Sequence, residues 1–431
     1  MTQRWIPVFI LASLGLIQAQ PKAPEHWVAT WATAQNLVRP IPQPRPVTPA
    51  ATTTSPAPAA PTAGPAITPK TINARGFTNQ TVRMMVRTSL PGKRVRIRLT
   101  NAFGGTPVIL GTAHIALRAK DSAIVPGSDR AITFDGKPGA MIGAGWMLAS
   151  DPVELDIPAV TEVAVSLFFP GETGAPTSHG TALHNTYISK EGDVTAAAEI
   201  AEPVITQSYY FLAGVDVVAD NDAGTIVTFG DSITDGARSS NESDHAWPAL
   251  LAARLAANKA TTKVGVANMG IGGNRVLRDG AGASALARWD RDVLSQPGVK
   301  WVTLMEGIND IGREASVPAE APTPEELIAA YKQLIAMSHA RGIKIIGCTL
   351  TPYEGAGYAR EKGEATRTAV NTWIKTSGAF DAVIDFEAAT RDAASPKKLR
   401  PDFDPGDHLH PNDAGYEAMA NAIDLKIFTK K

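Results

Sequence analysis

The chain is poor in cysteine: Cys348 is the only one in 431 residues. A single cysteine excludes an internal disulfide, so the fold cannot depend on a disulfide framework. Cys348 lies in the apolar run IIGCTL, where no neighbour would lower a thiol pKa. We therefore expect a small buried side chain on a strand and not a cysteine nucleophile.

The chain also lacks a charge excess and a long apolar run after its first residues. Its 41 basic and 42 acidic residues give a formal net charge of -1. This balance offers no general electrostatic attraction for nucleic acid or an anionic membrane, so we expect no nucleic-acid partner. The 44% hydrophobic and 19% charged content is typical of a globular protein, and the length favours two domains.

Residues 1–20 read MTQRWIPVFILASLGLIQAQ and predict a signal peptide. Arg4 gives a positive start, residues 6–17 are an apolar run, and Ala19 is a small residue at a cleavage position. The alternative is a membrane anchor, but this run is shorter than the roughly 20 residues that a bilayer requires. We therefore expect a secreted or periplasmic protein with no stable membrane anchor after cleavage.

Residues 21–220 predict a β domain. Segments such as TVRMMVRTS and KRVRIRLTN alternate apolar with polar residues, with Gly and Pro between the segments, which is typical of an antiparallel β-sandwich. Ten prolines in residues 40–69 favour an extended surface loop inside this domain. We interpret the arginines of RVRIR as a solvated face, in preference to a basic binding stripe. His179 and His184 have no partner that the sequence identifies, so we take them as ordinary loop histidines.

Residues 221–431 predict a second domain of a different class. Apolar strands such as TIVTFG, VKWVTLMEG and IKIIGCTLT alternate with amphipathic helices. One helix covers TPEELIAAYKQLIAMSHARG, with Thr323 as its cap and Gly342 at its end. This alternation predicts a parallel sheet that is covered by helices on both faces. Ligands of such sheets bind at the carboxyl ends of the strands, so the turns after the strands are the candidate sites.

Two of these turns carry groups suited to acyl chemistry. Ser232 follows a strand in TFGDSITDGA, where its hydroxyl and its backbone N–H can face a ligand. In this turn alone, a helix cap is the more ordinary role, and the G-x-S-x-G elbow is absent. The glycine-rich turn NMGIGGNRV lacks the pattern of a phosphate loop or a dinucleotide fingerprint. It fits better as the donor of a backbone N–H, most plausibly from Gly273.

Two further turns could complete a catalytic site. In TLMEGINDIG, the amide of Asn309 can donate to an oxyanion, although asparagine is also a common turn residue. In PGDHLHPND, Asp407 and His410 are three residues apart, so one helical turn would bring them together. His410 could then accept a proton from Ser232 while Asp407 holds the other ring nitrogen. His408 would point away.

Together the four turns resemble the SGNH hydrolases, the GDSL esterase/lipase superfamily, in order and in spacing. The matching residues are the Ser232 of G-D-S, the Gly273 of the second block, the Asn309 of G-x-N-D, and the D-x-x-H pair Asp407 and His410. The resemblance implies a Ser232 nucleophile, a His410 base and an orienting Asp407. It also implies an oxyanion hole built from the Ser232 and Gly273 amides and the Asn309 side chain.

The resemblance covers roughly residues 222–428 and implies a flavodoxin-like three-layer αβα hydrolase fold with no metal or organic cofactor. The whole chain also looks like secreted bacterial members of this family that carry an N-terminal β domain. The expected activity is therefore that of a secreted serine esterase. By analogy, the expected substrate carries short acyl groups, such as acetyl, on carbohydrate, and an acylated polysaccharide is the expected partner.

Two alternatives stay open. One is a general short-chain esterase or lipase, although no long apolar lid segment is visible. The other is a non-catalytic binding protein that uses the β domain. Three residues near the motifs, Arg275, Trp247 and Glu306, could contact substrate, but structural roles are at least as compatible with the sequence.

Overall fold

The computed structural model describes Thr2, residues 24–37 and residues 75–429. The expected signal peptide at 1–20 and the proline-rich loop at 40–69 therefore lie outside the described residues, Thr2 apart. Below, "β region" denotes residues 24–37 and 75–218, and "α/β region" denotes residues 224–429. Within the part of the chain that the structure describes, no helix combines the length and apolarity needed to cross a bilayer.

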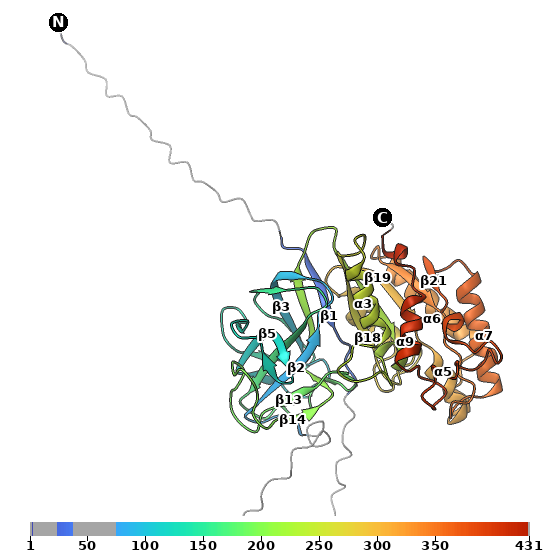
Figure 1. Ribbon diagram of the computed structural model, residues 1–431, viewed down its shortest axis with the longest axis horizontal. Coiled ribbons are helices and arrows are strands. Elements are labelled where there is room, and N and C mark those ends of the chain that lie inside the picture. The colour runs from blue at the N-terminus through green and yellow to red at the C-terminus, as the bar shows by residue number, and fades with distance from the viewer. Residues whose placement is uncertain (1, 3–23, 38–74, 430–431) are drawn as a thin grey trace, which may run out of the picture.

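The β region contains two large antiparallel sheets (Figure 1). The first has the order β1-β16-β3-β10, with β9 also paired to β3; its strands are β1 Trp27–Ala32, β3 Gly92–Thr100, β9 Met147–Ala149, β10 Val153–Ile157 and β16 Leu212–Val218. The second has the order β14-β13-β2-β11-β5-β6, with β7 also paired to β5; its strands are β2 Gln80–Arg87, β5 Thr112–Lys120, β6 Ala123–Ile124, β7 Arg130–Ile132, β11 Glu162–Phe169, β13 Thr186–Ile188 and β14 Val204–Thr206. Two short ribbons pair β4 Val108–Leu110 with β8 Ala140–Ile142, and β12 Ser178–His179 with β15 Tyr209–Tyr210.

Both large sheets contribute to one hydrophobic core, as a sandwich requires. Val95 and Ile97 on β3 belong to the same buried cluster as Val82 and Val165 on β2 and β11. Met85, on the opposite face of β2, belongs to a second small core, so β2 is buried on both faces.

The arginines of RVRIR are a solvated face only in part, because Arg94 keeps 38% of its side chain exposed whereas Arg98 is buried. Arg96 and Arg98 both donate to Asp216, a carboxylate with no exposed surface, through contacts of 3.0 Å each. Arg98 also donates to Gln296 Oε1 at 2.8 Å, and Gln296 belongs to the α/β region. A buried carboxylate requires a cation, and this requirement draws the arginines inward.

The α/β region has a five-stranded parallel sheet with the order β18-β17-β19-β20-β21. Its strands are β17 Gly224–Gly230, β18 Val264–Gly270, β19 Val299–Met305, β20 Lys344–Cys348 and β21 Ala382–Ile384. Counted along the chain this order is 2-1-3-4-5, the flavodoxin-like order, and it confirms the expected α/β fold. Cys348 is buried at the end of β20, as expected, and burial raises the pKa of its thiol.

Helices follow the strands of this sheet, with α3 packed on β18 and α6 packed on β20. Their bounds are α2 Ser232–Asp235, α3 Trp247–Ala257, α4 Ala285–Trp289, α5 Ile308–Gly312, α6 Pro324–His339, α7 Glu361–Thr376, α8 Phe386–Thr390 and α9 Asp413–Asn421. A π-turn, Asp290–Leu294, extends α4, and short 3₁₀ turns occupy Arg313–Ala315, Pro318–Glu320 and Leu425–Phe428.

The ends of two helices test the sequence expectations. Thr323 caps α6 and forms a reciprocal capping box with Glu326, which confirms the expected start. The pattern NDAGYEAMANAIDLKIF predicts a last helix over residues 412–428, and the observed helix is shorter. It ends at Asn421, and Asp424 caps a separate 3₁₀ turn by accepting from the Lys426 N–H.

The two regions are joined along strand β1, beside which β18 lies in Figure 1. Thr33 and Asn268 form a parallel bridge. The Thr225 hydroxyl donates to the Ala29 carbonyl at 2.9 Å, and the Val266 N–H donates to Ser89 Oγ at 2.9 Å. The β region therefore packs directly on the strands that carry the candidate site.

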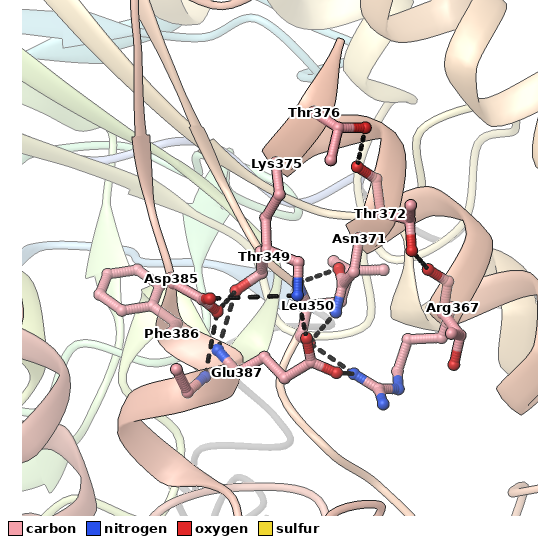
Figure 2. A network of polar contacts seen from close by, with 12 residues as sticks. Thr349, Leu350, Arg367, Asn371, Thr372, Lys375, Thr376, Asp385, Phe386 and Glu387 are labelled. Atoms are coloured by element: carbon pink, nitrogen blue, oxygen red, sulfur yellow. Dashed lines mark hydrogen bonds and ion pairs between the residues drawn. The ribbon is translucent and has the colours of Figure 1, made fainter. Parts of the chain in front are cut away.

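A polar network fixes α7 to the end of β20 (Figure 2). The Asn371 side chain accepts from the Leu350 N–H and donates to the Leu350 carbonyl, both at 2.8 Å. Arg367 donates to the same carbonyl and to Glu387, each at 2.9 Å. Thr349 closes the network through Asp385 at 2.9 Å. The network fixes the start of the loop that leads from β20 towards the candidate site.

Candidate active site

Ser232 is the first residue of α2, directly after strand β17. The Asp231 side chain caps this helix by accepting from the Ile233 N–H at 3.0 Å. A Cβ on Gly230 would lie 2.3 Å from the Met305 carbonyl oxygen, so the tight strand-to-helix turn requires glycine there. Ser232 is largely buried, with 8% of its surface exposed.

The structure brings the three residues of the expected triad together. Ser232 Oγ and His410 Nε2 are 2.8 Å apart, although 178 residues separate them in the sequence. His410 Nδ1 lies 3.0 Å from Asp407 Oδ2 on its other side. When the ring proton is on Nδ1, Asp407 accepts it, and Nε2 is free to accept from the serine hydroxyl.

Asp407 is held as a carboxylate. Its Oδ1 accepts from the backbone N–H groups of Leu409 and His410, at 3.1 and 3.0 Å. Its Oδ2 accepts from Arg238 Nε at 2.9 Å, in addition to the His410 ring. Partial burial opposes ionisation, but the hydrogen bonds from His410, Arg238 and Leu409 hold the pKa of Asp407 well below its usual range.

The other histidine of the same loop has a separate partner. His408 has a φ of 59°, and its Nδ1 lies against Asp404 Oδ2, while its backbone N–H donates to Asp404 Oδ1 at 3.0 Å. Half of the His408 side chain is exposed. The structure therefore places His410, and not His408, beside Ser232.

The two expected oxyanion donors lie on the neighbouring turns. Gly273 has a φ of 73°, a conformation that favours glycine, and no described residue accepts a hydrogen bond from its N–H. Asn309 lies at the start of α5 and donates through Nδ2 to the Asn274 carbonyl at 3.0 Å. An amide nitrogen has two hydrogens, so this contact fixes the Asn309 side chain and leaves one donor for a ligand.

A cluster of buried acids lies beneath these turns. Burial raises the pKa of Asp231 to about 7, of Asp310 to about 6 and of Glu306 to about 8. The cation among them is Arg288, itself fully buried, which lies 3.4 Å from Glu306. Asp310 accepts from the Val276 N–H at 2.7 Å, and this contact holds the chain that follows the Gly273 turn.

The three residues with open roles have structural contacts. Arg275 pairs with Glu320 at 2.9 Å. Trp247 is fully buried and packs on Phe386 with ring centroids 5.2 Å apart. Glu306 belongs to the buried acid cluster described above.

The expectation that His179 and His184 are ordinary loop residues is wrong. His179 is buried on β12, and its Nε2 lies 2.9 Å from Oδ1 of Asp235, the last residue of α2. His184 Nε2 lies 3.0 Å from Asp244 Oδ1. Both acids belong to the α/β region, so no local sequence signal could have identified either pair.

One cluster of the described residues has the spacing of metal ligands. Glu162, His184 and Asp244 bring ligand atoms within 4.8 Å of one another. Arg118 already pairs with Glu162 at 3.2 Å, and Arg87 pairs with Asp244 at 3.1 Å. Two guanidinium groups supply the positive charge in this cluster, so its carboxylates do not need a metal ion.

Residues 228–418 match the model of the GDSL-like lipase/acylhydrolase family. An acetylxylan esterase from Geobacillus stearothermophilus is 28% identical over 215 residues, which are 46% of this chain and 91% of that protein.

Two solved structures are also similar to this chain. A variant of an acetyl xylan esterase from Geobacillus stearothermophilus is 27% identical, with 48% of this chain and 96% of that chain covered and a TM-score of 0.38. An alpha/beta hydrolase enzyme from the metagenome of Lake Arreo, Spain, is 25% identical, with 48% and 98% covered and a TM-score of 0.37. With the family match to residues 228–418 and the acetylxylan esterase relative, these residues form a domain of the GDSL-like lipase/acylhydrolase family, the SGNH hydrolases, and the protein is a carboxylic ester hydrolase.

Proposed function

We propose that the protein hydrolyses esters through a triad of Ser232, His410 and Asp407, and that its preferred substrates carry short acyl groups on carbohydrate. The observation that carries the catalytic part is the continuous chain of contacts from Ser232 Oγ through the His410 ring to Asp407, at 2.8 and 3.0 Å. Such a chain activates a serine hydroxyl that is otherwise a weak nucleophile.

In the proposed mechanism, Ser232 Oγ attacks the ester carbonyl carbon while His410 Nε2 accepts the hydroxyl proton. The oxyanion of the tetrahedral intermediate is stabilised by the N–H groups of Ser232 and Gly273 and by the second amide hydrogen of Asn309. His410 then returns the proton to the departing alcohol. Water, activated by the same imidazole, releases the acid from the acyl-enzyme.

The Asp407 carboxylate supports the base in two ways. It fixes the ring so that Nε2 faces Ser232, and its negative charge stabilises the imidazolium that forms during attack. The backbone donors and Arg238 keep Asp407 ionised well into the acid range.

The acetyl part of the proposal rests on the acetylxylan esterase relative and extends to this chain by analogy. The alternatives are a general short-chain esterase or lipase and a non-catalytic binding protein that uses the β domain. Export belongs to the same proposal, on the signal-like composition of residues 1–20. The mass of the protein recovered from a native host would test it, because a cleaved signal removes about 20 residues.

A substrate panel tests the proposed specificity. We expect p-nitrophenyl acetate to be hydrolysed faster than p-nitrophenyl esters of longer acids, and acetate to be released from acetylated xylan. Ser232→Ala should abolish both activities. Ser239→Ala is the matched control, because this buried serine of the next turn donates its hydroxyl to the Gly236 carbonyl and makes no contact with His410. Equal rates in wild type and Ser232→Ala would contradict the catalytic assignment, whereas a preference for long acyl chains would contradict only the substrate assignment.

A further inference from the structure

The Asp235 carboxylate links three parts of the molecule. It belongs to α2, the helix that begins with Ser232, and it is buried, with 4% of its surface exposed. Its Oδ2 accepts from the Gly272 N–H at 2.9 Å, and its Oδ1 lies 2.9 Å from His179 Nε2. Both oxygens are therefore engaged, one with the glycine turn of the site and the other with the β region.

The Gly272 contact bears directly on the expected oxyanion donor. Gly272 immediately precedes Gly273, and a Cβ on Gly272 would lie 4.0 Å from the Ser232 Cβ. A Cβ on Gly270 would lie 2.2 Å from the Asp235 backbone nitrogen, so the end of β18 and the end of α2 are in close contact. The Asp235 carboxylate thus fixes the turn that contains Gly273 relative to the serine.

His179 lies on a short strand that is held by the pairing of β12 with β15. Strand β12 pairs with β15, with His179 opposite Tyr209, and their rings stack with centroids 6.2 Å apart. His179 Nε2 also lies 3.1 Å from the Thr181 carbonyl. Burial alone would lower the pKa of His179, but the charge of Asp235 and the hydrogen bonds raise the pKa above its usual value.

We infer that His179 is a positioning residue of the hydrolase site: through Asp235 and the Gly272 N–H, the β region holds the Gly273 turn in the geometry that stabilises the oxyanion. This inference rests on the proposed function, because it assigns a purpose to the contact only if Gly273 donates to the intermediate. It gives the β region a role in catalysis that needs no contact with the substrate.

Two variants break the contact and one restores it. His179→Ala removes the donor to Asp235, and His179→Asn keeps a polar side chain that ends short of Asp235. His179→Gln can place an amide nitrogen near the original Nε2. The matched control is His184→Ala, because His184 is also a buried histidine that pairs with an acid of the α/β region, and it has no contact with the Gly273 turn.

The measurement is kcat per active site, with the sites counted by stoichiometric reaction with a fluorophosphonate. Counting removes any unfolded fraction from the result. We expect kcat for p-nitrophenyl acetate to fall about 10- to 100-fold in His179→Ala and His179→Asn. This decrease is smaller than the one caused by deleting an oxyanion donor. In these two variants KM should change far less than kcat, and the affinity for an alkyl boronic acid should fall in parallel with kcat. His179→Gln should recover most of the rate.

The outcomes separate this inference from the proposed function. If Ser232→Ala is inactive but both breaking variants keep wild-type kcat per counted site, His179 is only structural and the inference fails. A loss of equal size in His184→Ala would also overturn it, because any disturbance of the junction would then suffice. If Ser232→Ala hydrolyses the ester as wild type does, the proposed function itself fails.

Discussion

Two histidines separated by one residue have different partners, and the backbone explains the difference. The Asp407 carboxylate accepts from the backbone N–H groups of Leu409 and His410, which folds the loop into a turn and brings the His410 ring back over Asp407. His408, between Asp407 and Leu409, has a φ of 59° and turns outward to Asp404. A D-x-x-H spacing therefore specifies which imidazole becomes available to the serine.

This arrangement predicts unequal losses on replacement of the two rings. His410→Ala should lower kcat by about 10³-fold or more, as removal of a triad member does, because Ser232 then has no base. His408→Ala removes a half-exposed ring that has no contact with Ser232 and should change kcat by much less. Steady-state hydrolysis of p-nitrophenyl acetate measures both, and the reverse order of effects would show that the base has been misassigned.

At the scale of elements, the position of α7 determines the path of the chain after β20. Asn371 forms hydrogen bonds with both the N–H and the carbonyl of Leu350, a buried residue that lies beyond the end of β20 (Figure 2). The loop that follows carries Tyr358, whose hydroxyl lies 3.5 Å from Asn309 Oδ1. Helix α7 thereby contributes from a distance to the support of Asn309, the proposed oxyanion donor.

Replacement of Asn371 should therefore cost stability. Asn371→Ala leaves the buried Leu350 N–H without its acceptor, and we expect the free energy of unfolding to fall by about 1–3 kcal/mol. Thr372→Ala is the control on the same helix, since its exposed hydroxyl only bonds back to the Thr368 carbonyl. Urea unfolding of both variants measures the difference. Equal stabilities would mean that the Leu350 contacts contribute little.

At the scale of the whole molecule, the buried acids make stability depend on pH. Burial raises the pKa of Glu306 to about 8, and one of its oxygens, Oε1, has no hydrogen-bond partner among the described residues. In the unfolded chain a glutamate loses its proton near pH 4.3. Between these two values the folded state holds the proton that the unfolded state has released, so stability falls as pH rises through this window.

Glu306→Gln should remove the part of this dependence that Glu306 contributes, because glutamine has the same shape and does not titrate. We expect the free energy of unfolding of the variant to rise relative to wild type as pH increases from 5 to 8, by at most about 1.4 kcal/mol per pH unit. The exposed replacement Glu325→Gln is the control and should leave the wild-type slope unchanged. Parallel curves for Glu306→Gln and wild type would contradict a protonated Glu306.

Much of the α/β region could be predicted from the sequence because its signals are local. Buried strands, amphipathic helices and the Thr323 cap each depend on neighbouring residues, and the parallel sheet follows from their alternation. Ser232, Gly273 and Asn309 lie in turns after strands, and parallel strands bring such turns to one edge. The candidate site was therefore accessible to sequence reasoning before any coordinates.

The contacts between the regions could not be predicted in this way. His179 and Asp235 are 56 residues apart, one on strand β12 and the other on helix α2. Strand β12 has only two residues, too few for a periodic pattern. Arg96 and Arg98 likewise pair with Asp216, a buried aspartate on another strand. Alternation marks which residues can face outward, but it does not show what covers them.

Covalent labelling tests whether His410 activates Ser232 as a nucleophile. A fluorophosphonate forms a stable adduct with a serine hydroxyl that an adjacent base activates. Mass spectrometry of the digested protein should find one adduct per chain, on the peptide that contains Ser232. Labelling should be absent in Ser232→Ala and much slower in His410→Ala. An adduct at another residue, or equal labelling of wild type and Ser232→Ala, would show that Ser232 is not the nucleophile.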